Sequence, residues 1–219
     1  MTAPHELFPA YQSGREFDDD LIEQLKVLPE LVAAFGLANA KAEGYEADDF
    51  LAAAVASEES GGGSALVASG DRDSFQLASS RTTILYPSRG GEVARIGPEE
   101  VRQRYGVDPN QVPDFIALRG DSSDKLPGAA GVGPKRAAQL VQRYGTLEGV
   151  LKADLFQTQA EMLRLYRLIA TMDARAPLPS LADQQPTGDS ASTFARDRGL
   201  DQLANRLNDL PGLVCSVPR

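Results

Sequence analysis

Hydrophobic patterning divides the chain into two parts of different character. Up to residue 96, helical patterns alternate with short apolar runs at 65–69 and 82–86 that are typical of buried strands. From Gly97 onward, strand patterns disappear and only helical ones remain. The chain is therefore predicted to be an α/β domain with a mostly parallel sheet over residues 1–96, followed by an all-helical domain over residues 97–219.

The expected elements follow from periodicity and from start and stop residues. Helices are expected at 18–35, 46–59, 75–79, 98–105, 109–119, 134–144, 147–151, 159–172 and 200–207, with a third strand at 92–96 and a loop over 174–193. Asp18, Asp19 and Asp20 open the first helix, where acids complement the helix dipole. That structural interpretation is favoured over a metal site.

Cysteine and histidine usage narrows the possible chemistry. Cys215 and His5 are the only residues of their kinds, which excludes an internal disulfide and the ligand set of a typical zinc site. A bound metal would have to be a hard ion such as Mg²⁺ or Mn²⁺ held by carboxylates. No apolar run reaches the roughly 20 residues of a membrane span, and residues 1–6 lack signal-peptide character. A cytoplasmic protein without a membrane partner is expected.

The net charge of −9 is unevenly distributed. Residues 1–96 carry 7 Lys and Arg against 16 Asp and Glu, whereas residues 97–219 carry 15 of each. The stretch from Lys125 to Thr146 contains Lys125, Lys135, Arg136 and Arg143 and no acid. The acidity is local, and a separate basic patch exists that could contact nucleic acid.

Three acidic clusters lie at element ends. Glu46, Asp48 and Asp49 begin a helix, Asp71 and Asp73 follow a buried strand, and Asp121 and Asp124 lie in a loop between helices. Each cluster alone fits a helix start or a turn. Together, with few bases nearby, they would repel one another unless protons or metal ions neutralised them. Paired divalent ions are the economical explanation, and such pairs catalyse phosphodiester hydrolysis.

A glycine-rich hairpin precedes the helix expected at 134–144. Gly131 and Gly133 leave room for a phosphate near the backbone, the helix start offers N–H groups, and Lys135 adds charge. The same pattern also fits a tight turn. Because it lies in the acid-free basic patch, a sequence-independent grip on a nucleic-acid backbone is favoured.

Three motifs and the hairpin, in this order, resemble the 5' nucleases, which include the 5'-3' exonuclease domain of bacterial DNA polymerase I and the flap endonucleases. The matching stretches are 44–49, 69–77 and 120–128, running into 131–135. The resemblance covers roughly Phe8 to Met172. It implies a PIN-like α/β nuclease domain followed by a SAM-fold-like domain with a helix-three-turn-helix that holds duplex DNA, with a potassium ion at its hairpin.

The resemblance also implies roles for individual residues. Two divalent ions, Mg²⁺ or Mn²⁺, would be held by Glu46, Asp48, Asp49, Asp71, Asp73, Asp121 and Asp124. Arg15 and Arg72 would stabilise charge at the scissile phosphate. Gly131, Gly133, Lys135 and Arg136 would bind the DNA duplex.

The chain departs from the family pattern in several places. Family members begin with a strand that carries an aspartate, then helices and a second strand with another metal-site aspartate, and this sequence starts downstream of both. Gln12 replaces a usual lysine, Lys125 a usual asparagine and Arg72 a usual lysine. The sequence is therefore expected to be a fragment or an incorrectly started reading of a longer gene, or a truncated product with reduced or no activity.

Three functions follow from these observations. The first is a metal-dependent 5'-3' exodeoxyribonuclease or flap endonuclease, expected as a monomer, that acts on DNA with 5' ends, nicks or flaps. The second is a noncatalytic DNA-binding protein whose metal site is incomplete. The third is a PIN-type ribonuclease, which the duplex-binding hairpin disfavours.

Overall fold

The computed structural model describes residues 8–9, 11, 17–181, 184 and 186–209. Two compact units divide the chain, and each draws on two separate stretches of sequence. Unit 1 comprises Met1–Gly14 and Ala42–Ala176, and unit 2 comprises Arg15–Lys41 and Pro177–Arg219. The expected domain boundary between residues 96 and 97 falls inside unit 1. That boundary stays a prediction from the sequence and does not separate the two compact units.

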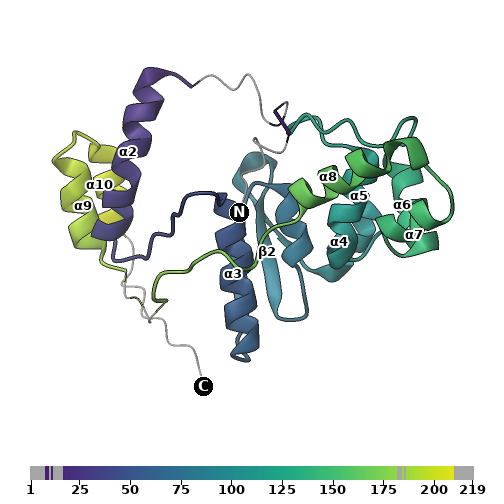
Figure 1. Cartoon of the computed structure of the whole chain (residues 1–219). Coiled ribbons are helices and arrows are strands. Elements are labelled where there is room, and N and C mark those ends of the chain that lie inside the picture. Colours follow the sequence, from purple (N-terminus) through teal and green to yellow (C-terminus); the bar gives the residue numbers. More distant parts are fainter. Residues whose placement is uncertain (1–7, 10, 12–16, 182–183, 185, 210–219) are drawn as a thin grey trace. The chain divides into compact units, whose positions relative to one another are not determined.

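Unit 1 combines a small sheet with helices (Figure 1). Its elements are α3 (Ala47–Ser60), β1 (Ala65–Ala68), the 3₁₀ helix η1 (Arg72–Leu77), β2 (Thr82–Pro87), η2 (Arg89–Gly91), β3 (Val93–Ile96), α4 (Pro98–Tyr105), η3 (Pro109–Gln111), α5 (Val112–Arg119), α6 (Pro134–Tyr144), α7 (Leu147–Lys152), η4 (Gln157–Gln159) and α8 (Ala160–Ala170). The mixed α/β character and the helical second half agree with the sequence-based expectation.

The sheet has the order β1-β2-β3. β1 pairs with β2 in parallel, with Val67 opposite Ile84, and β2 pairs with β3 in antiparallel fashion, with Ile84 opposite Ile96. Residues 88–92, which join β2 to β3, are too few for the crossover that a parallel pair needs. The described sheet is therefore mixed, and the expected parallel pairing holds only between β1 and β2.

Proline and glycine set the bounds of two helices where the sequence predicted them. α4 begins at Pro98 and α6 at Pro134, the first helical position, where a missing N–H is tolerated. Gly106 with φ 73° and Gly145 with φ 80° end these helices in a backbone region that favours glycine. Local start and stop signals therefore account for both elements.

Two expected elements need correction. The helix expected at 75–79 is the 3₁₀ helix η1, which starts earlier because Asp71 caps it, its Oδ1 accepting the Asp73 N–H at 2.9 Å. The loop expected over 174–193 contains the start of α9 (Gly188–Arg196). Its Ser192 is buried and donates to the Ala204 carbonyl at 2.9 Å. Packing against a neighbouring helix stabilises α9 despite its polar composition.

One hydrophobic core runs through unit 1. It joins Ile84 and Ile96 of the sheet to Phe115, Val141 and Leu163 of the helices, all of which are almost fully buried. α5 packs against both α6 and α8, and α3 lies beside β1. The acidic motifs at the ends of α3, β1 and α5 are thus carried by elements that share a core.

Unit 2 is built from α2 (Asp19–Ala34), α9 and α10 (Asp201–Asn208). Thr187 links its two chain segments, because its N–H donates to the Phe35 carbonyl at 2.9 Å. The helical periodicity of α2 is confirmed, but Leu21 and Leu25 on its apolar side remain 41% and 47% exposed. Among the residues the structure describes, no helix has the length and apolarity to span a bilayer.

Candidate functional site

The acidic clusters of the sequence come together in unit 1. Burial and the charges of Asp71 and Asp121 raise the pKa of Asp73 to about 8. Burial and the charges of Asp71 and Glu46 raise the pKa of Asp48 to about 6. Asp124, which is 9% exposed, acts on both carboxyls. Carboxylates from three separate chain segments therefore lie within range of one another's charge.

The middle cluster lies at the carboxyl end of β1, the edge where α/β sheets place their ligands. Ser69 Oγ accepts the Asp71 N–H at 3.1 Å, and the Asp71 carbonyl accepts from Ser74 Oγ at 2.5 Å. These bonds, with the cap that Asp71 forms for η1, fix the turn between strand and 3₁₀ helix. Asp73 is consequently held half-buried on the first turn of η1.

The loop after α5 is closed by backbone contacts. Asp121 and Leu126 exchange two hydrogen bonds, N to O, at 2.8 and 2.7 Å. Gly120 has φ 81° and Gly128 φ 72°, and a Cβ on Gly128 would lie 2.4 Å from the Gly120 nitrogen. Only glycine fits both positions, so these glycines fix the path of the loop that carries Asp121 and Asp124.

A basic side chain, that of Arg119, lies among the acidic residues of unit 1. Arg119 Nη2 lies 2.6 Å from Asp121 Oδ2, and both side chains are 18% exposed. Burial tends to raise the pKa of Asp121, but hydrogen bonds from Ser123 and the Arg119 charge outweigh it and hold that pKa below its ordinary value. The Arg119 guanidinium also lies 5.2 Å from the Phe115 ring centroid and 5.8 Å from that of Tyr105. The surroundings therefore lower the pKa of Asp121 and raise that of Asp73 nearby.

The start of α3 uses one of its acids for structure. Asp49 Oδ2 accepts the Glu46 N–H at 2.9 Å, half of a capping box. Asp49 Oδ1 accepts the Asp173 N–H at 2.7 Å. Each oxygen of the Asp49 carboxylate thus accepts one backbone N–H group, and these two bonds fix the orientation of the side chain.

The donor set suits a hard divalent cation chemically. Carboxylate oxygens are the preferred ligands of Mg²⁺ and Mn²⁺, and the raised pKa values of Asp48 and Asp73 reflect excess negative charge that a cation would relieve. Within the described part of the chain, however, no three acidic, histidine or cysteine side chains are close enough to hold one ion. The structure thus contains an acidic cluster, and metal ligation by it stays a prediction.

The hairpin before α6 is exposed. Gly131, Gly133, Lys135 and Arg136 all face solvent, whereas Val132 between the glycines is buried. A Cβ on either glycine would meet nothing within 4 Å. The glycines are therefore not required by packing, and the hairpin presents open backbone beside two cations at a helix start.

Comparison with known proteins assigns the chain to a family. Residues 1–106 match the model for the 5'-3' exonuclease N-terminal resolvase-like domain, and residues 107–191 match that for the 5'-3' exonuclease C-terminal SAM fold. The chain belongs to the 5'-3' exonuclease family. The resemblance inferred from the acidic motifs is confirmed, as is the SAM-like fold of the second half.

The relatives of this member of the 5'-3' exonuclease family are much longer proteins. A DNA polymerase I from Mycobacterium bovis is 42% identical over 146 residues, which are 66% of this chain and 16% of the relative. One from Deinococcus radiodurans is 40% identical over 153 residues, 69% of this chain and 16% of the relative. The chain therefore spans less than a fifth of the length of these relatives.

Solved structures of nucleases share the fold. A T5 5'-exonuclease with bound zinc superposes with a TM-score of 0.63 at 16% identity, covering 95% of this chain and 80% of that one. The catalytic core of Rad2 in complex with DNA gives 0.57 at 16% identity, covering 93% and 75%. At such identity the likeness establishes the 5'-3' exonuclease fold alone.

The two arginines assigned to charge stabilisation differ in what the structure describes. Arg15 lies outside the described residues, as does Gln12. Arg72 is exposed on η1, and its Nε donates to the Tyr86 hydroxyl at 3.2 Å. The charge of Asp121 acts on Arg72, which puts this cation close to the acidic cluster.

Sequence reasoning missed two residues of the site. Tyr11 is 8% exposed, and its hydroxyl donates to Glu46 Oε2 at 3.2 Å. Burial and the Glu46 charge raise the pKa of Tyr11 well above its usual range. The other missed residue is Arg119, whose only local signal is that it directly precedes Gly120 and Asp121. The sequence positions of Tyr11 and Glu46, or of Arg119 and Asp121, do not by themselves predict that these side chains are in contact.

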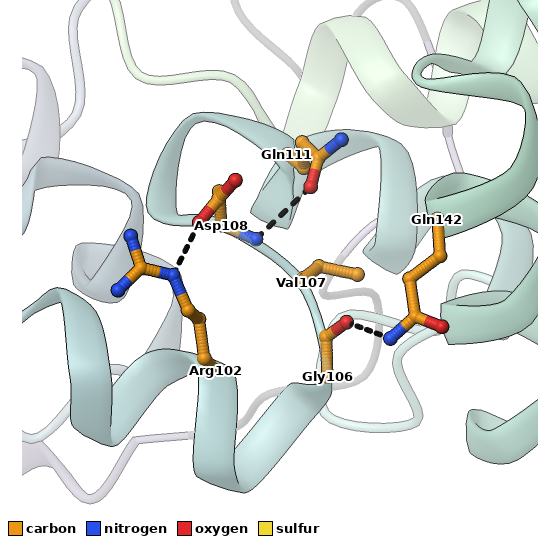
Figure 2. Close-up of a pocket in the computed structure, with 6 residues that line it drawn as sticks. All are labelled: Arg102, Gly106, Val107, Asp108, Gln111 and Gln142. Carbon is orange, nitrogen blue, oxygen red and sulfur yellow. Dashed lines mark hydrogen bonds and ion pairs between the residues drawn. The ribbon is translucent and has the colours of Figure 1, made fainter.

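A polar hollow lies elsewhere in unit 1, between α4, η3 and α6 (Figure 2). Arg102 Nε lies 2.6 Å from Asp108 Oδ1, and the Asp108 N–H donates to Gln111 Oε1 at 3.0 Å. Gln142 donates to the Gly106 carbonyl across the hollow. These bonds join the turn after α4 to α6, which gives the hollow a structural role.

Proposed function

We propose that this chain hydrolyses phosphodiester bonds of DNA at 5' ends, nicks or flaps, as a divalent-metal-dependent 5'-3' exonuclease. The observation that carries the proposal is the convergence of carboxylates from α3, η1 and the loop after α5, two of them with raised pKa values. Zinc bound to the T5 5'-exonuclease and DNA bound to the Rad2 core add support from proteins of the same fold.

The acidic cluster would hold the metal. The residues proposed for this are Glu46, Asp48, Asp49, Asp71, Asp73, Asp121 and Asp124, with two ions of Mg²⁺ or Mn²⁺ expected. Bound divalent ions would supply activation of a water molecule and stabilisation of the leaving oxygen. The chain's own part is to gather these carboxylates and to keep Asp121 ionised through Arg119.

Cations around the cluster would bind the substrate. Arg72 is exposed near the acidic cluster and would face the scissile phosphate, a role also proposed for Arg15. Gly131 and Gly133 would admit a phosphate to the start of α6, where Lys135 and Arg136 add charge. We also expect a potassium ion at this hairpin and a monomeric protein in the cytoplasm.

Cleavage of a defined substrate tests the proposal. The purified chain is incubated with a labelled 5'-flap duplex, with Mg²⁺ or with chelator, and the Asp71→Ala variant runs in parallel. Cleavage that needs Mg²⁺ and is lost in Asp71→Ala supports the enzyme. RNA of the same sequence serves as the comparison, because preferential RNA cleavage would favour a PIN-type ribonuclease.

A second candidate is a noncatalytic DNA-binding protein. One observation favours it: among the described residues, no three acidic side chains are close enough to hold an ion. Binding of the flap duplex with no cleavage at any Mg²⁺ or Mn²⁺ concentration would establish this function and exclude the first. Loss of that binding in a Lys135→Ala, Arg136→Ala double variant would place it at the hairpin.

A further inference from the structure

The end of α8 is tied to two acidic clusters by side-chain hydrogen bonds. Residues 170–173, here termed the brace, comprise the last residue of α8 and the three residues that follow it. Gln76 Nε2 donates to the Ala170 carbonyl at 2.9 Å, and Gln76 Oε1 accepts the Met172 N–H at 3.1 Å. Asp49 Oδ1 accepts the Asp173 N–H at 2.7 Å. Side chains of two different elements therefore hold the brace.

The same two side chains hold the clusters from which they come. Gln76 Nε2 also donates to the Asp73 carbonyl at 2.9 Å, within η1. Asp49 Oδ2 accepts the Glu46 N–H at the start of α3. Each side chain thus has one hydrogen bond to its own acidic cluster and at least one to the brace, so that the brace links the two clusters.

α8 is also fixed to the element that leads into the third cluster. Arg167 Nε lies 2.8 Å from Asp114 Oδ1, whose side chain is 5% exposed. Asp114 lies on α5, which ends at Arg119, just before the loop that carries Asp121. α8 and the brace that follows it therefore contact one cluster through Gln76 and a second through Asp49, and α8 is paired with the helix that precedes the third.

We propose that Gln76 and Asp49 are positioning residues, which set the spacing of the acidic clusters by binding them to the brace. The inference rests on the proposed metal-dependent function, and it moves Asp49 from the predicted ligands to the residues that align them. Both Asp49 oxygens already accept N–H groups in directions set by two separate backbone segments.

The need for such alignment follows from charge. Asp48 on α3 lies within range of the charge of Asp71 beside η1, and repulsion between such like charges would move the two elements apart if no contact opposed it. Hydrogen bonds outside the ligand set that orient metal ligands typically change metal affinity by about 10- to 100-fold when removed. The brace is therefore expected to affect metal affinity without supplying a ligand atom.

Gln76→Ala tests the first half of the proposal, with Gln111→Ala as a matched control. Gln111 also uses both ends of its amide, accepting the Asp108 N–H and donating to the Gly145 carbonyl, but lies at the polar hollow (Figure 2). In metal-free protein, hydrogen exchange at the Met172 N–H, which donates to Gln76 Oε1, should become faster in Gln76→Ala and stay as in the parent in Gln111→Ala. Mn²⁺ dissociation constants, measured by electron paramagnetic resonance, should rise about tenfold in that variant and less than about twofold in the control.

Asp49→Ala tests the second half against Asp71→Ala. Asp49→Ala should speed exchange at the Asp173 N–H and weaken Mn²⁺ binding while leaving the number of bound ions unchanged. Asp71→Ala should lower that number and leave Asp173 exchange as in the parent. If Asp49→Ala instead lowers the number of ions and leaves Asp173 exchange unchanged, Asp49 is a ligand and the positioning role is overturned.

Failure of the proposed function gives a different result from failure of the brace. A parent chain that binds no Mn²⁺ and cuts no DNA rejects the proposed function, while exchange at the Met172 and Asp173 N–H groups still reports on the brace. Parent-like exchange at the Met172 N–H in Gln76→Ala rejects the brace even if the parent is an active nuclease. Faster exchange at the Met172 N–H in Gln76→Ala but not in Gln111→Ala supports the brace in either case.

Discussion

Asp73 holds its proton in the folded chain at a pH where a free carboxyl would have lost it. Its pKa is raised from 3.8 to about 8 by burial and then by the neighbouring carboxylates. Between these values the unfolded chain is ionised at this position and the folded chain is not. Folding therefore takes up a proton, and the stability linked to Asp73 is complete below about pH 4 and lost as pH rises toward 8.

The melting temperature of the metal-free protein should consequently fall as pH rises from 5 to 9. For a chain of this size, about 1 kcal/mol corresponds to about 2–4 °C. Calorimetry in chelator measures the effect, and saturating Mg²⁺ should raise the melting temperature most at high pH. Asp73→Asn should flatten the profile, whereas a parent profile that rises from pH 6 to 9 would contradict this account.

Arg119 is the residue whose loss should most disturb the cluster. Arg119→Ala removes the 2.6 Å ion pair with Asp121 and the contacts with two aromatic rings, and it leaves a half-buried carboxylate without its cation. We expect a loss of about 2–4 kcal/mol in the free energy of unfolding. Urea denaturation measures it.

Arg102→Ala is a suitable control for Arg119→Ala. Arg102 also pairs with acids, Asp108 at 2.6 Å and Glu99 at 3.3 Å, but its side chain is 50% exposed. Its removal should lower the free energy of unfolding far less than removal of Arg119, because solvent screens exposed ion pairs. Equal losses for the two variants would show that burial of Arg119 adds nothing to the ion pair.

The site was only partly predictable at the residue scale, and the reason is the range of the contacts. Asp48, Asp71 and Asp124, which the structure brings within range of one another's charge, could be picked out as candidates because each stands in a short local motif. Tyr11, Arg119 and Gln76 were missed because their partners are distant in sequence or because nothing marks the contact: the Gln76 bond to Ala170 joins positions 94 residues apart. A local sequence pattern reveals acidic motifs and turns. It does not reveal which side chain will contact the end of a helix that is distant in sequence.

At the element scale, the loop after α5 depends on Gly120 and Gly128, which lie against neighbouring backbone, whereas the glycines of the hairpin do not. Gly128 and Gly131 both have positive φ, 72° and 70°, but only at Gly128 would a Cβ strike backbone, at 2.4 Å. Gly131→Ala should cost about 1–2 kcal/mol, from the backbone conformation alone. Gly128→Ala should cost more than this, because the chain around Gly120 must also move.

Urea denaturation of Gly128→Ala and Gly131→Ala measures the two losses in the free energy of unfolding. Their difference is the part that comes from the close approach of the Gly128 and Gly120 backbones. The Gly128 variant should also lose Mn²⁺ affinity, since the moved loop carries Asp121 and Asp124. Equal losses for the two variants would mean that the loop can shift at little cost in free energy. Glycine would then be needed at Gly128 only because its φ is positive.

Elements were predicted well where local chemistry sets them. α4 and α6 match because proline begins each and glycine ends each. α9 was missed because its stabilising contacts, such as that of Ser192 with α10, are tertiary. The mixed sheet was missed because the direction of β3 depends on the length of its connection to β2 rather than on the apolar runs.

At the scale of the whole molecule, the negative charge and the proposed DNA grip lie on different parts of the chain. Residues 1–96 are strongly acidic, and Lys135 and Arg136 are exposed at the hairpin in the acid-free stretch. DNA affinity should therefore depend on a few cations. The number of phosphate contacts sets the slope of log affinity against log salt, at about 0.9 per contact.

Lys135→Ala and Arg136→Ala should each reduce that slope by about 1 and weaken binding to all sequences alike. Fluorescence anisotropy at several salt concentrations measures this. Lys152→Ala, an exposed lysine on α7, is the control and should leave the slope unchanged. A larger change for Lys152 than for Lys135 would place the DNA elsewhere.

The division into two units has a consequence for synthesis of the chain. Every helix and strand described for unit 1 lies before residue 176, so its core can form while later residues are still being added. Unit 2 cannot form in that way, because Thr187 donates to the Ala34 carbonyl across 153 positions. α2 must therefore stay without its α9 and α10 partners on the ribosome until residues 188–208 have been added, long after unit 1 can close its core.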